Sequence, residues 1–443
     1  MSNYAIENIN QIYGDLPQSW SLVKLEELLE LKRAELQTGP FGTMLHASSY
    51  REEGTPVLAV QHVGNNRINH DVDIPRVDQE TFNRLSRYVI NKDDIIFCRK
   101  GAVERIALVT EAEDGWLQGS DCIRLRIIDT LTLNPVFFSY VFCSQAYKRW
   151  ITKHAHGATM PSLNQTILGL SPIPLPQIEE QRNIAKTLSL LDRSISNLRK
   201  QNETLEKIAQ TLFKHWFVDF EFPNEDGKPY KSSGGAMVRS DLGEIPVGWR
   251  VGKLGDEVET LGGGTPSTQN PDYWEDGNIS WYSPTDLTKS KTLFSLGSEK
   301  RITRLGLEKS SAKLFRKYSL LLTSRATIGE ITINTQEACT NQGFIVIIPN
   351  EKFSVYFLHG WLLTQINLIK QLASGSTFPE LSKSIFRKFS FLIPEFSLLT
   401  QYDRIIRPLF QKNENNTRQI QTLTKTRDLL LPKLMSGQIR LGD

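Results

Sequence analysis

The sequence has few cysteines and no long apolar run. Its four cysteines, Cys98, Cys122, Cys143 and Cys339, are scattered, and no two are spaced as a metal-binding pair. This argues against a zinc site or a disulfide framework and fits a reducing cytoplasm. No apolar stretch reaches the roughly 18 residues that span a bilayer, and the first residues do not resemble a signal peptide. We therefore expect a cytoplasmic protein with no membrane partner.

The excess of charge is also small. The net charge of +3 over 443 residues does not by itself identify a nucleic-acid-binding protein. Residues 1–175 hold 17 Lys and Arg against 20 Asp and Glu, whereas residues 236–443 hold 26 against 20. DNA binding therefore needs basic residues gathered on one face, or further positive charge from partner proteins. The length exceeds that of a single hydrophobic core and predicts two to four domains.

Motifs for catalysis are missing as well. Residues 134–137 and 270–273 resemble the adenine-methyltransferase motif but lack its second proline, and no glycine-rich cofactor loop accompanies them. Asn134 and Pro135 instead predict the start of a helix. The glycines at 262–264 lack the spacing of a phosphate loop. His154 and His156 have no evident third metal ligand. The chain is therefore predicted not to be an enzyme and to bind no metal.

The sequence does contain a long internal repeat. Trp20 and Trp249 open two copies 229 positions apart. The matching residues near the end of each copy lie 218 positions apart; they are Gly157, Thr159, Pro161 and Leu163 in copy one and Gly375, Thr377, Pro379 and Leu381 in copy two. A repeat of over 200 residues is far longer than solenoid periods and indicates a duplicated domain.

Each copy has a β-rich first part followed by a long helix. Short runs of β-branched residues separated by Gly, Asn and Asp predict strands, and longer helices are expected near 135–153 and 353–373. Residues 221–244 have little apolar content and predict an exposed connector. The predicted segments are 1–175, 176–220, 221–244, 245–393 and 394–443.

The two long helices carry matching heptad seams. The seam of copy one is Ile184, Leu188, Leu191, Ile195, Leu198, Asn202, Leu205 and Leu212, and that of copy two is Leu409, Asn413, Asn416, Ile420, Leu423 and Leu430. A period of 3.5 predicts a coiled-coil contact, and polar core residues set its register. The alternative is that each helix packs only on its own globular part.

Two similar domains in one chain are expected to be related by a pseudo-twofold axis, which makes the two helices antiparallel. The predicted fold class is α+β, with two tandem α/β domains separated by an antiparallel coiled coil. About 30 helical residues extend roughly 45 Å. Twofold DNA-binding proteins place their two reading elements about one DNA turn apart, each on one half of the DNA site (a half-site), and a spacer of this length suits that arrangement. Because the two copies differ in sequence, the half-sites should differ too.

Several segments also resemble a known family, the specificity subunits of type I restriction–modification systems. In copy two they are residues 264–267, 273–274, 279–281, 286–287, 323–329, 340–344 and 373–377. Elsewhere they are residues 174–176, 180–181, 216–220, 231–235, 243–246, 248–249 and 429–437. The resemblance covers essentially the whole chain, and copy one departs most between about 38 and 130.

The resemblance implies a division of labour. Residues 1–175 and 245–393 become target-recognition domains, each reading one half of an asymmetric, bipartite site in double-stranded DNA. The helices at 176–220 and 394–443 become the spacer. Two methyltransferase subunits would bind S-adenosylmethionine and methylate adenine, and motor–nuclease subunits would use ATP with magnesium for restriction. This chain would itself bind no cofactor.

Candidate DNA-binding residues lie near predicted strand ends. Arg and Lys suit guanine, and Asn and Gln suit adenine, while Gly-rich loops can hold phosphates through backbone amides. The candidates are Arg99, Lys100, Gly101, Ser120, Thr265, Arg325, Asn341, Gln342 and Ser376, and Gln61 and His62 are further candidates. The alternative for each is a structural role. For Asn341 and Gln342 this is a turn in which the side chains bond their own backbone.

Two other functions stay open from the sequence. An enzyme, such as a fused methyltransferase or nuclease, would need a cofactor loop or a carboxylate cluster, and neither is evident. A coiled-coil scaffold that binds only protein, without sequence readout, would show equal affinity for all DNA sequences.

Overall fold

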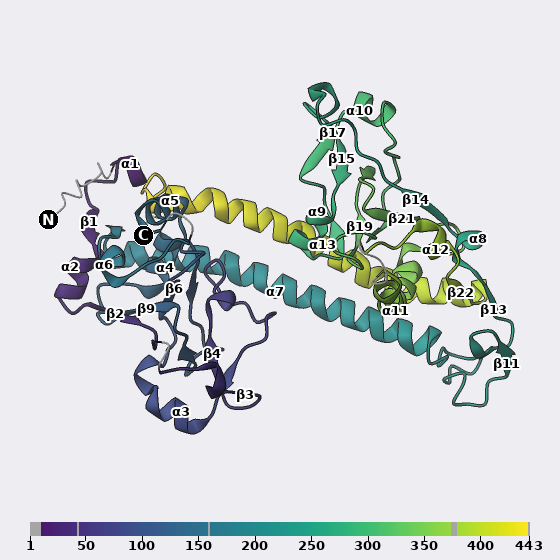
Figure 1. Ribbon diagram of the computed structural model, residues 1–443, viewed down its shortest axis with the longest axis horizontal. Coiled ribbons are helices and arrows are strands. Elements are labelled where there is room, and N and C mark those ends of the chain that lie inside the picture. Colours follow the sequence, from purple (N-terminus) through teal and green to yellow (C-terminus); the bar gives the residue numbers. More distant parts are fainter. Residues whose placement is uncertain (1–9, 42–43, 158–159, 374–378, 442–443) are drawn as a thin grey trace. The chain divides into compact units, whose positions relative to one another are not determined.

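The structure is a computed structural model that describes residues 10–41, 44–157, 160–373 and 379–441 (Figure 1). The chain divides into two compact units: unit 1 comprises residues 1–194 with 423–443, and unit 2 comprises residues 195–422. Both units combine helices with small sheets, so the predicted α+β class is confirmed. None of the helices in the described ranges is long and apolar enough to cross a membrane.

Unit 1 is built on a four-stranded antiparallel sheet in the order β2-β9-β6-β7. These strands are β2 (Ala34–Thr38), β9 (Cys122–Ile127), β6 (Ile95–Cys98) and β7 (Ile106–Leu108). The central strands β6 and β9 are buried almost throughout. Short apolar runs bounded by turn residues favour such strands because both of their faces are covered.

Unit 2 repeats this sheet and adds one strand. The order is β14-β21-β18-β19-β16, and β16 pairs in parallel with β19. These strands are β14 (Glu259–Gly262), β21 (Phe344–Ile348), β18 (Leu320–Thr323), β19 (Ile331–Asn334) and β16 (Phe294–Ser295). Each strand of the unit 1 sheet therefore has a counterpart in unit 2, which confirms the duplication inferred from the sequence.

A second sheet is also repeated, except that its strand β3 has no counterpart in unit 2. In unit 1 its order is β3-β5-β4-β8, and in unit 2 it is β17-β15-β20. The pairs β4–β8 and β15–β20 are both parallel, whereas β4–β5 and β15–β17 are both antiparallel. The strands are β3 (Tyr50–Arg51), β4 (Thr55–Leu58), β5 (Arg76–Val77), β8 (Leu117–Gln118), β15 (Ile279–Tyr282), β17 (Lys300–Ile302) and β20 (Ala338–Thr340).

A two-stranded ladder joins the start and the end of each globular part. β1 (Ser21–Lys24) pairs with β10 (Pro172–Leu175) in unit 1, and β13 (Arg250–Lys253) pairs with β22 (Ser390–Ile393) in unit 2. Trp20 directly precedes β1, and Trp249 directly precedes β13. Both tryptophans, which open the two copies, are buried. Each globular part is thereby closed by pairing its own ends.

Helices fill the remaining described segments. The shorter ones are α1 (Asn10–Tyr13), α2 (Leu25–Glu30), α3 (Gln79–Arg84), α4 (Pro135–Cys143), α5 (Gln145–His154), α6 (Gln165–Gly169), α8 (Leu254–Glu257), α9 (Pro284–Ser290), α10 (Arg304–Glu308), α11 (Val355–Ala373) and α12 (Lys383–Arg387). The 3₁₀ turns are η1 (Ala47–Ser49), η2 (Val60–His62), η3 (Ser86–Tyr88) and η4 (Pro271–Tyr273). The helices expected near 135–153 and 353–373 are present as α4 with α5 and as α11. Asn134 caps α4 as predicted, because its side chain accepts the amide of Phe137 at 2.9 Å.

The long helices α7 (Ile178–Phe217) and α13 (Phe396–Met435) have 40 residues each, about ten more than expected. Their predicted seams face each other. In unit 2, the amide of Asn416 donates to Asn202 at 2.9 Å, and Asn413 donates to Glu206 at 2.9 Å. Residues later in α7 contact residues earlier in α13, so the two helices are antiparallel as predicted.

The seam is polar near the middle of the two long helices, in the part that belongs to unit 2. Asn202, Asn413 and Asn416 are all at least nine-tenths buried, and Asn202 also donates to Thr417 at 3.3 Å. In unit 1, Arg427 donates to Asp192 at 2.7 Å. Buried amides that bond each other penalise other registers, because a slipped helix would leave them unpaired.

Each long helix contributes to the core of both units. Ile184, Ala185 and Leu188 of α7 belong to the core of unit 1, whereas Phe213, Trp216 and Phe217 belong to that of unit 2. In the same way, Leu434 and Met435 of α13 belong to the core of unit 1, and Leu399, Tyr402 and Ile406 belong to that of unit 2. The alternative, in which each helix packs only on its own globular part, is therefore wrong. The predicted segment boundaries stay predictions.

The connector is exposed over most of its length, as predicted, although a few of its side chains are buried or partly buried. Phe222 is 8% exposed and stacks on Tyr230 and Trp249, with ring centroids 4.6 and 5.3 Å apart. Residues 237–246 form a hairpin of β11 (Met237–Ser240) and β12 (Gly243–Pro246). A few aromatic side chains anchor a segment whose average composition is polar, and composition alone does not reveal them.

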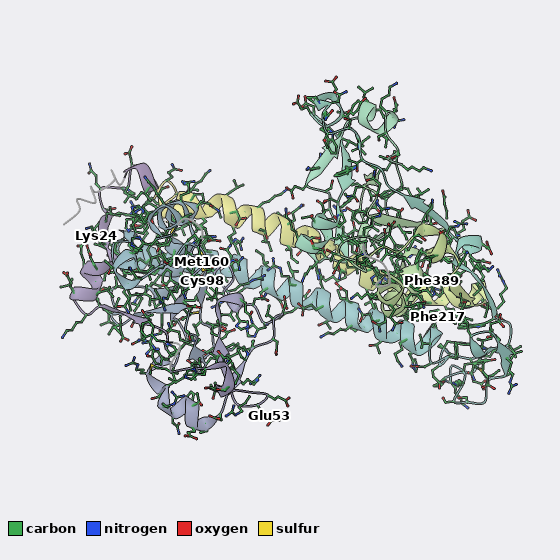
Figure 2. All side chains as sticks on the ribbon, viewed as in Figure 1. Lys24, Glu53, Cys98, Met160, Phe217 and Phe389 are labelled. Atoms are coloured by element: carbon green, nitrogen blue, oxygen red, sulfur yellow. The ribbon has the colours of Figure 1, made fainter. Side chains whose placement is uncertain are left out.

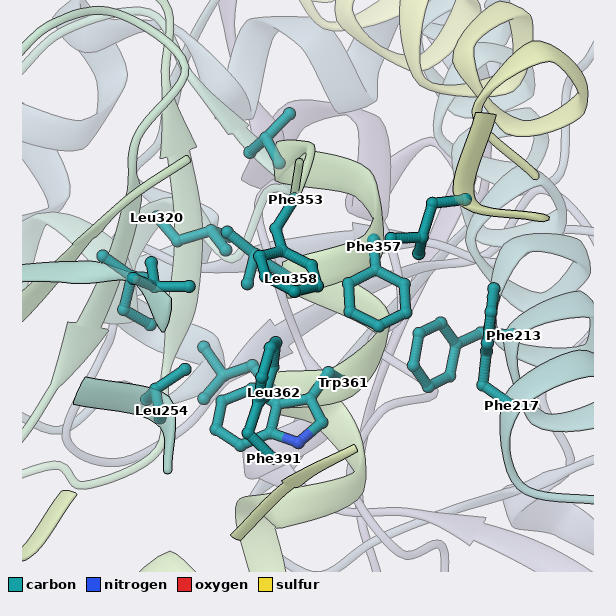
Figure 3. Packing of buried hydrophobic residues seen from close by; sticks show 14 of the residues in the cluster. Phe213, Phe217, Leu254, Leu320, Phe353, Phe357, Leu358, Trp361, Leu362 and Phe391 are labelled. Carbon is teal, nitrogen blue, oxygen red and sulfur yellow. The ribbon is translucent and has the colours of Figure 1, made fainter. Parts of the chain in front are cut away.

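Aromatic side chains dominate the core of unit 2 (Figure 3). Phe213 and Phe217 of α7 lie 5.5 and 5.0 Å from Phe357 of α11, measured between ring centroids. Phe391 of β22 lies 5.1 Å from Trp361 of α11. These contacts attach the end of α7 to α11 and the closing ladder.

Replacing Phe213 tests this attachment. Phe213→Ala should lower the free energy of unfolding by about 3–5 kcal/mol, because a buried aromatic ring leaves a cavity. Urea unfolding followed by tryptophan fluorescence measures it. Leu372→Ala, on the exposed side of α11, is the control and should change stability little. A loss below about 1 kcal/mol for Phe213→Ala would contradict the packing.

Stability should also depend on the pH through His359. This side chain is buried on α11 with its ring edge to face with Phe410, and burial lowers its pKa from 6.5 to about 4. The unfolded chain binds a proton near pH 6.5 but the folded chain does not, so stability falls as the pH decreases from about 6.5 to about 4, by at most about 3 kcal/mol.

Unfolding free energies between about pH 4.5 and pH 7 measure this effect. His359→Leu should flatten the dependence, whereas His215→Gln, at an exposed position of α7, should not. An unchanged slope in His359→Leu would show that other groups cause the acid sensitivity.

Candidate nucleic-acid interface

Three chain segments meet at the end of the central strand in each unit. In unit 1 they are residues 39–41 after β2, 99–101 after β6 and 119–121 between β8 and β9. In unit 2 they are residues 263–265 after β14, 324–326 after β18 and 341–343 between β20 and β21. We call these sets the three-segment faces of unit 1 and unit 2. Figure 2 labels Cys98, the last residue of β6. The segment 99–101 of the unit 1 face follows it directly.

Main-chain hydrogen bonds hold both faces in the same way. In unit 1 the amide of Arg99 donates to Asp121 at 2.7 Å, and in unit 2 the amide of Ser324 donates to Gly343 at 2.8 Å. The third segment of each face is also bonded to a strand of the second sheet. The amide of Gly119 donates to Leu58 of β4 at 2.9 Å in unit 1, and the amide of Asn341 donates to Tyr282 of β15 at 2.9 Å in unit 2. The frame of each face is therefore independent of most side chains that stand on it.

Glycine is required where the segments approach most closely. A Cβ atom on Gly39 would lie 2.0 Å from the carbonyl oxygen of Gly119, and one on Gly263 would lie 2.0 Å from that of Asn341. Backbone atoms cannot tolerate such a contact without moving apart. The first segment of each face therefore reaches the turn through a position that only glycine fits.

A fourth segment borders each face: residues 162–163 in unit 1 and residues 380–381 in unit 2. The amide of Leu163 donates to Arg99 at 2.8 Å, and the amide of Leu381 donates to Ser324 at 3.0 Å. These leucines end the repeated pattern noted in the sequence. Their neighbours form isolated antiparallel bridges, Ser162 with Lys100 and Glu380 with Arg325.

The face of unit 1 carries an aromatic ring and two cations. The guanidinium of Arg99 lies 5.4 Å from the ring centroid of Phe41, which is 57% exposed. The ammonium of Lys100 lies 3.4 Å from a carboxylate oxygen of Asp121. Gly101 has a φ of +76° and open space around it, so the loop turns sharply directly after the two cations.

The face of unit 2 carries different side chains at the same places. Thr265, at the position of Phe41, donates its hydroxyl to the side-chain oxygen of Gln342 at 2.7 Å. Arg325, at the position of Lys100, pairs with Glu380 at 2.6 Å. Ala326, at the position of Gly101, also has a left-handed φ of +60°.

The structure gathers the predicted site residues but does not give them equal roles. Arg99, Lys100, Gly101 and Ser120 lie on the face of unit 1, and Thr265, Arg325, Asn341 and Gln342 lie on that of unit 2. Ser376 lies outside the described residues. Contact of these residues with DNA stays a prediction.

Two candidates have structural roles in the fold. The side-chain oxygen of Asn341 accepts the amide of Gly343 at 2.8 Å, which is the turn-forming alternative. His62 is fully buried, and its ring accepts the amide of Ala59 at 3.0 Å. As an exposed DNA-contact candidate His62 is wrong, because its ring completes the η2 turn. Gln61, next to it, is exposed.

Phe41, Asp121 and Glu380 also lie at or beside these faces, but they are not among the site residues predicted from the sequence. An exposed phenylalanine and two carboxylates do not stand out as DNA-binding residues. Aligning the two copies segment by segment could have found them, because it matches each loop of copy one with its counterpart in copy two. The offset between matching residues changes from one loop to the next, which hides the match: Lys100 and Arg325 are 225 positions apart, whereas Ser120 and Gln342 are 222 apart.

The cysteines offer no reactive thiol. Burial raises the pKa of the Cys98, Cys143 and Cys339 thiols to about 12, and the pKa of Cys122 rises well above its ordinary value for the same reason. All four thiols stay protonated near neutral pH and act as apolar core groups. In the described part of the chain, no group of three His, Cys, Asp or Glu residues is placed to hold a metal ion.

The fold and its two faces define a duplicated protein that presents different side chains on two equivalent backbone frames. The sequence pattern of the type I restriction modification DNA specificity domain matches residues 17–207 and again residues 246–425. The chain therefore belongs to the family of type I restriction–modification DNA specificity proteins, and the family domain occurs in it twice.

Individual relatives agree with this assignment. The chain is 33% identical over 315 residues to the type I restriction enzyme MjaIX specificity subunit of Methanocaldococcus jannaschii, over 69% of each chain. It is 25% identical over 408 residues to the HindI specificity subunit of Haemophilus influenzae, over 80% of this chain and 88% of that relative. The crystal structure of an S subunit from M. genitalium has the same fold, with a TM-score of 0.59 over 94% of this chain and 96% of that chain at 18% identity.

The close approach at Gly263 can be tested by a pair of alanine substitutions. Gly263→Ala should push residues 263–265 away from the turn and break the bond from the amide of Gly264 to Thr340, which is 2.8 Å long. We expect a loss of about 1–3 kcal/mol in stability and faster hydrogen exchange at residues 264 and 341–343.

The matched control is Gly262→Ala, whose Cβ would meet no atom within 4 Å. It should leave exchange at these residues unchanged. Equal effects of the two substitutions would show that the face does not depend on the contact.

Proposed function

We propose that this chain is the DNA-sequence-specificity subunit of a type I restriction–modification complex. Each unit reads one half of an asymmetric, bipartite site in double-stranded DNA. The observation that carries the proposal is the pair of three-segment faces, which share one backbone frame and differ in exposed side chains. Equal frames place the two faces against DNA in the same manner, and unequal side chains read different bases.

The side chains on the faces suit base recognition. Phosphate contacts position a protein on DNA, whereas contacts to base edges specify the sequence. Arginine pairs with guanine through two hydrogen bonds, glutamine pairs with adenine, and an apolar group meets the methyl of thymine. Arg325 and Gln342 in unit 2, and Arg99 and Phe41 in unit 1, supply these groups on exposed loops.

Partners supply the chemistry in this proposal. Two methyltransferase subunits, carrying S-adenosylmethionine, methylate adenine at the site that this chain selects, and motor–nuclease subunits with ATP and magnesium carry out restriction. The chain itself is non-catalytic, binds no cofactor and works in the cytoplasm. The net negative charge of residues 1–175 supports the need for additional positive charge from the partners.

Binding of the assembled methyltransferase to DNA tests the proposal. A methylation map of cellular DNA first identifies the two half-sites. At matched salt, the complex should bind the mapped site about a thousandfold or more tightly than random DNA. The purified chain alone should methylate no DNA. Equal affinity for all sequences would favour the protein-binding scaffold and contradict the proposal.

Exchange of one globular part tests the division between the units. Replacing residues 245–393 with the equivalent part of a relative should change one half-site in the methylation map and leave the other unchanged. Unaltered helices should keep the gap between the half-sites constant. A change in both half-sites would contradict independent reading by the two units.

A further inference from the structure

A basic residue occupies the same loop position in both units, and each is paired with a carboxylate. Lys100 and Arg325 both follow the central strand by two residues and both bridge to the fourth segment. The acid comes from a different place in each unit. Asp121 belongs to the turn between β8 and β9, whereas Glu380 belongs to the fourth segment.

We propose that Glu380 is a positioning residue that presets Arg325 to recognise a guanine, and that Asp121 restrains Lys100 in the corresponding way. This inference rests on the proposed function. It makes Arg325 and its acid a specificity-determining pair for one base pair of one half-site.

Structural need does not explain the pairs. The side chains of Arg325 and Glu380 are 50% and 41% exposed, and those of Lys100 and Asp121 are 48% and 43% exposed. Exposed ion pairs add little to stability. A carboxylate on a face that binds DNA also repels phosphates. The recurrence of such a pair in both units, built from different acids, therefore indicates a role in recognition.

The geometry suits a preset guanidinium. Glu380 accepts from one terminal nitrogen of Arg325 at 2.6 Å, and a guanidinium has five N–H donors in a rigid plane. The remaining donors stay available for the two acceptors that guanine presents in the major groove. Fixing the plane beforehand removes rotamer freedom that binding would otherwise cost.

The backbone restricts Arg325 from the other side. Ala326 adopts a left-handed φ of +60°, which residues with a side chain rarely adopt. The amide of Leu381 bonds Ser324 at 3.0 Å and so ties the loop to the segment that carries Glu380. The arginine is thus anchored before and after its own position, while its side chain is held by the acid.

Binding by the assembled methyltransferase to duplexes with single base-pair changes in the mapped site tests the proposal. Arg325→Ala should lower discrimination at one base pair of one half-site by about 10- to 100-fold. Glu380→Gln should reduce discrimination at the same base pair and tighten binding to random DNA by a few fold, because one negative charge is lost. In the Arg325→Ala background, Glu380→Gln should no longer affect discrimination.

Two controls separate positioning from general charge. Glu308→Gln removes a carboxylate from another exposed ion pair of unit 2, with Arg304 at 2.9 Å, and should leave discrimination unchanged. Asp121→Asn should affect only the other half-site. Thermal unfolding of each variant should match that of the unchanged chain, since the pairs are exposed.

Three outcomes overturn the inference. The first is no change in discrimination on Glu380→Gln. The second is a uniform change for all sequences, and the third is an effect that persists without Arg325. In all three cases the proposed function stands if the unchanged complex still distinguishes its half-sites from random DNA. A complex that binds all sequences equally would instead contradict the proposed function itself.

Discussion

The contact between α7 and α13 is the constraint on which both units depend. Each helix supplies core side chains to unit 1 and to unit 2, so neither core is complete without both helices. The contact is antiparallel, and the buried amides of Asn202, Asn413 and Asn416 define which residues face each other. Polar groups at these places reduce the apolar area of the contact but exclude registers in which an amide would be buried unpaired.

One polar group in this contact shows what burial costs. Glu206 receives a hydrogen bond from Asn413, and burial raises the pKa of its carboxyl. The side-chain oxygens of Asn413 and Asn416 have no partner in the described part of the chain. The seam therefore combines strong apolar ends with a centre whose polar groups are only partly satisfied, as is common where specificity of pairing outweighs stability.

The sequence predicts the fold well where periodicity carries the signal. The heptad seams, the duplication and the central strands are confirmed because each depends on the regular spacing of many residues. The connector is different: Phe222 stacks between Tyr230 and Trp249, and single aromatic contacts of this kind leave no periodic trace. The candidate site could be predicted only in part. The predicted strand ends located its loops, but the sequence could not reveal which acidic side chain pairs with which basic side chain.

The two copies also differ inside their sheets. Arg124 and Arg126 of β9 lie where Val346 and Ile348 of β21 lie in the second copy. Arg124 is buried, and the partly exposed Arg126 pairs with the buried Asp94 at 2.6 Å. The same strand order thus tolerates an ionic or an apolar filling. Side-chain chemistry diverges even in the core as long as the main-chain ladder is kept.

Main-chain bonds, rather than side chains, build the frame of each face, and this has an evolutionary consequence. A mutation at Phe41, Thr265 or Gln342 alters what the surface presents without removing a bond that folding requires. Single substitutions can therefore change the exposed side chains of a face while the fold stays stable. A protein organised in this way keeps its architecture while the exposed side chains of its two faces change.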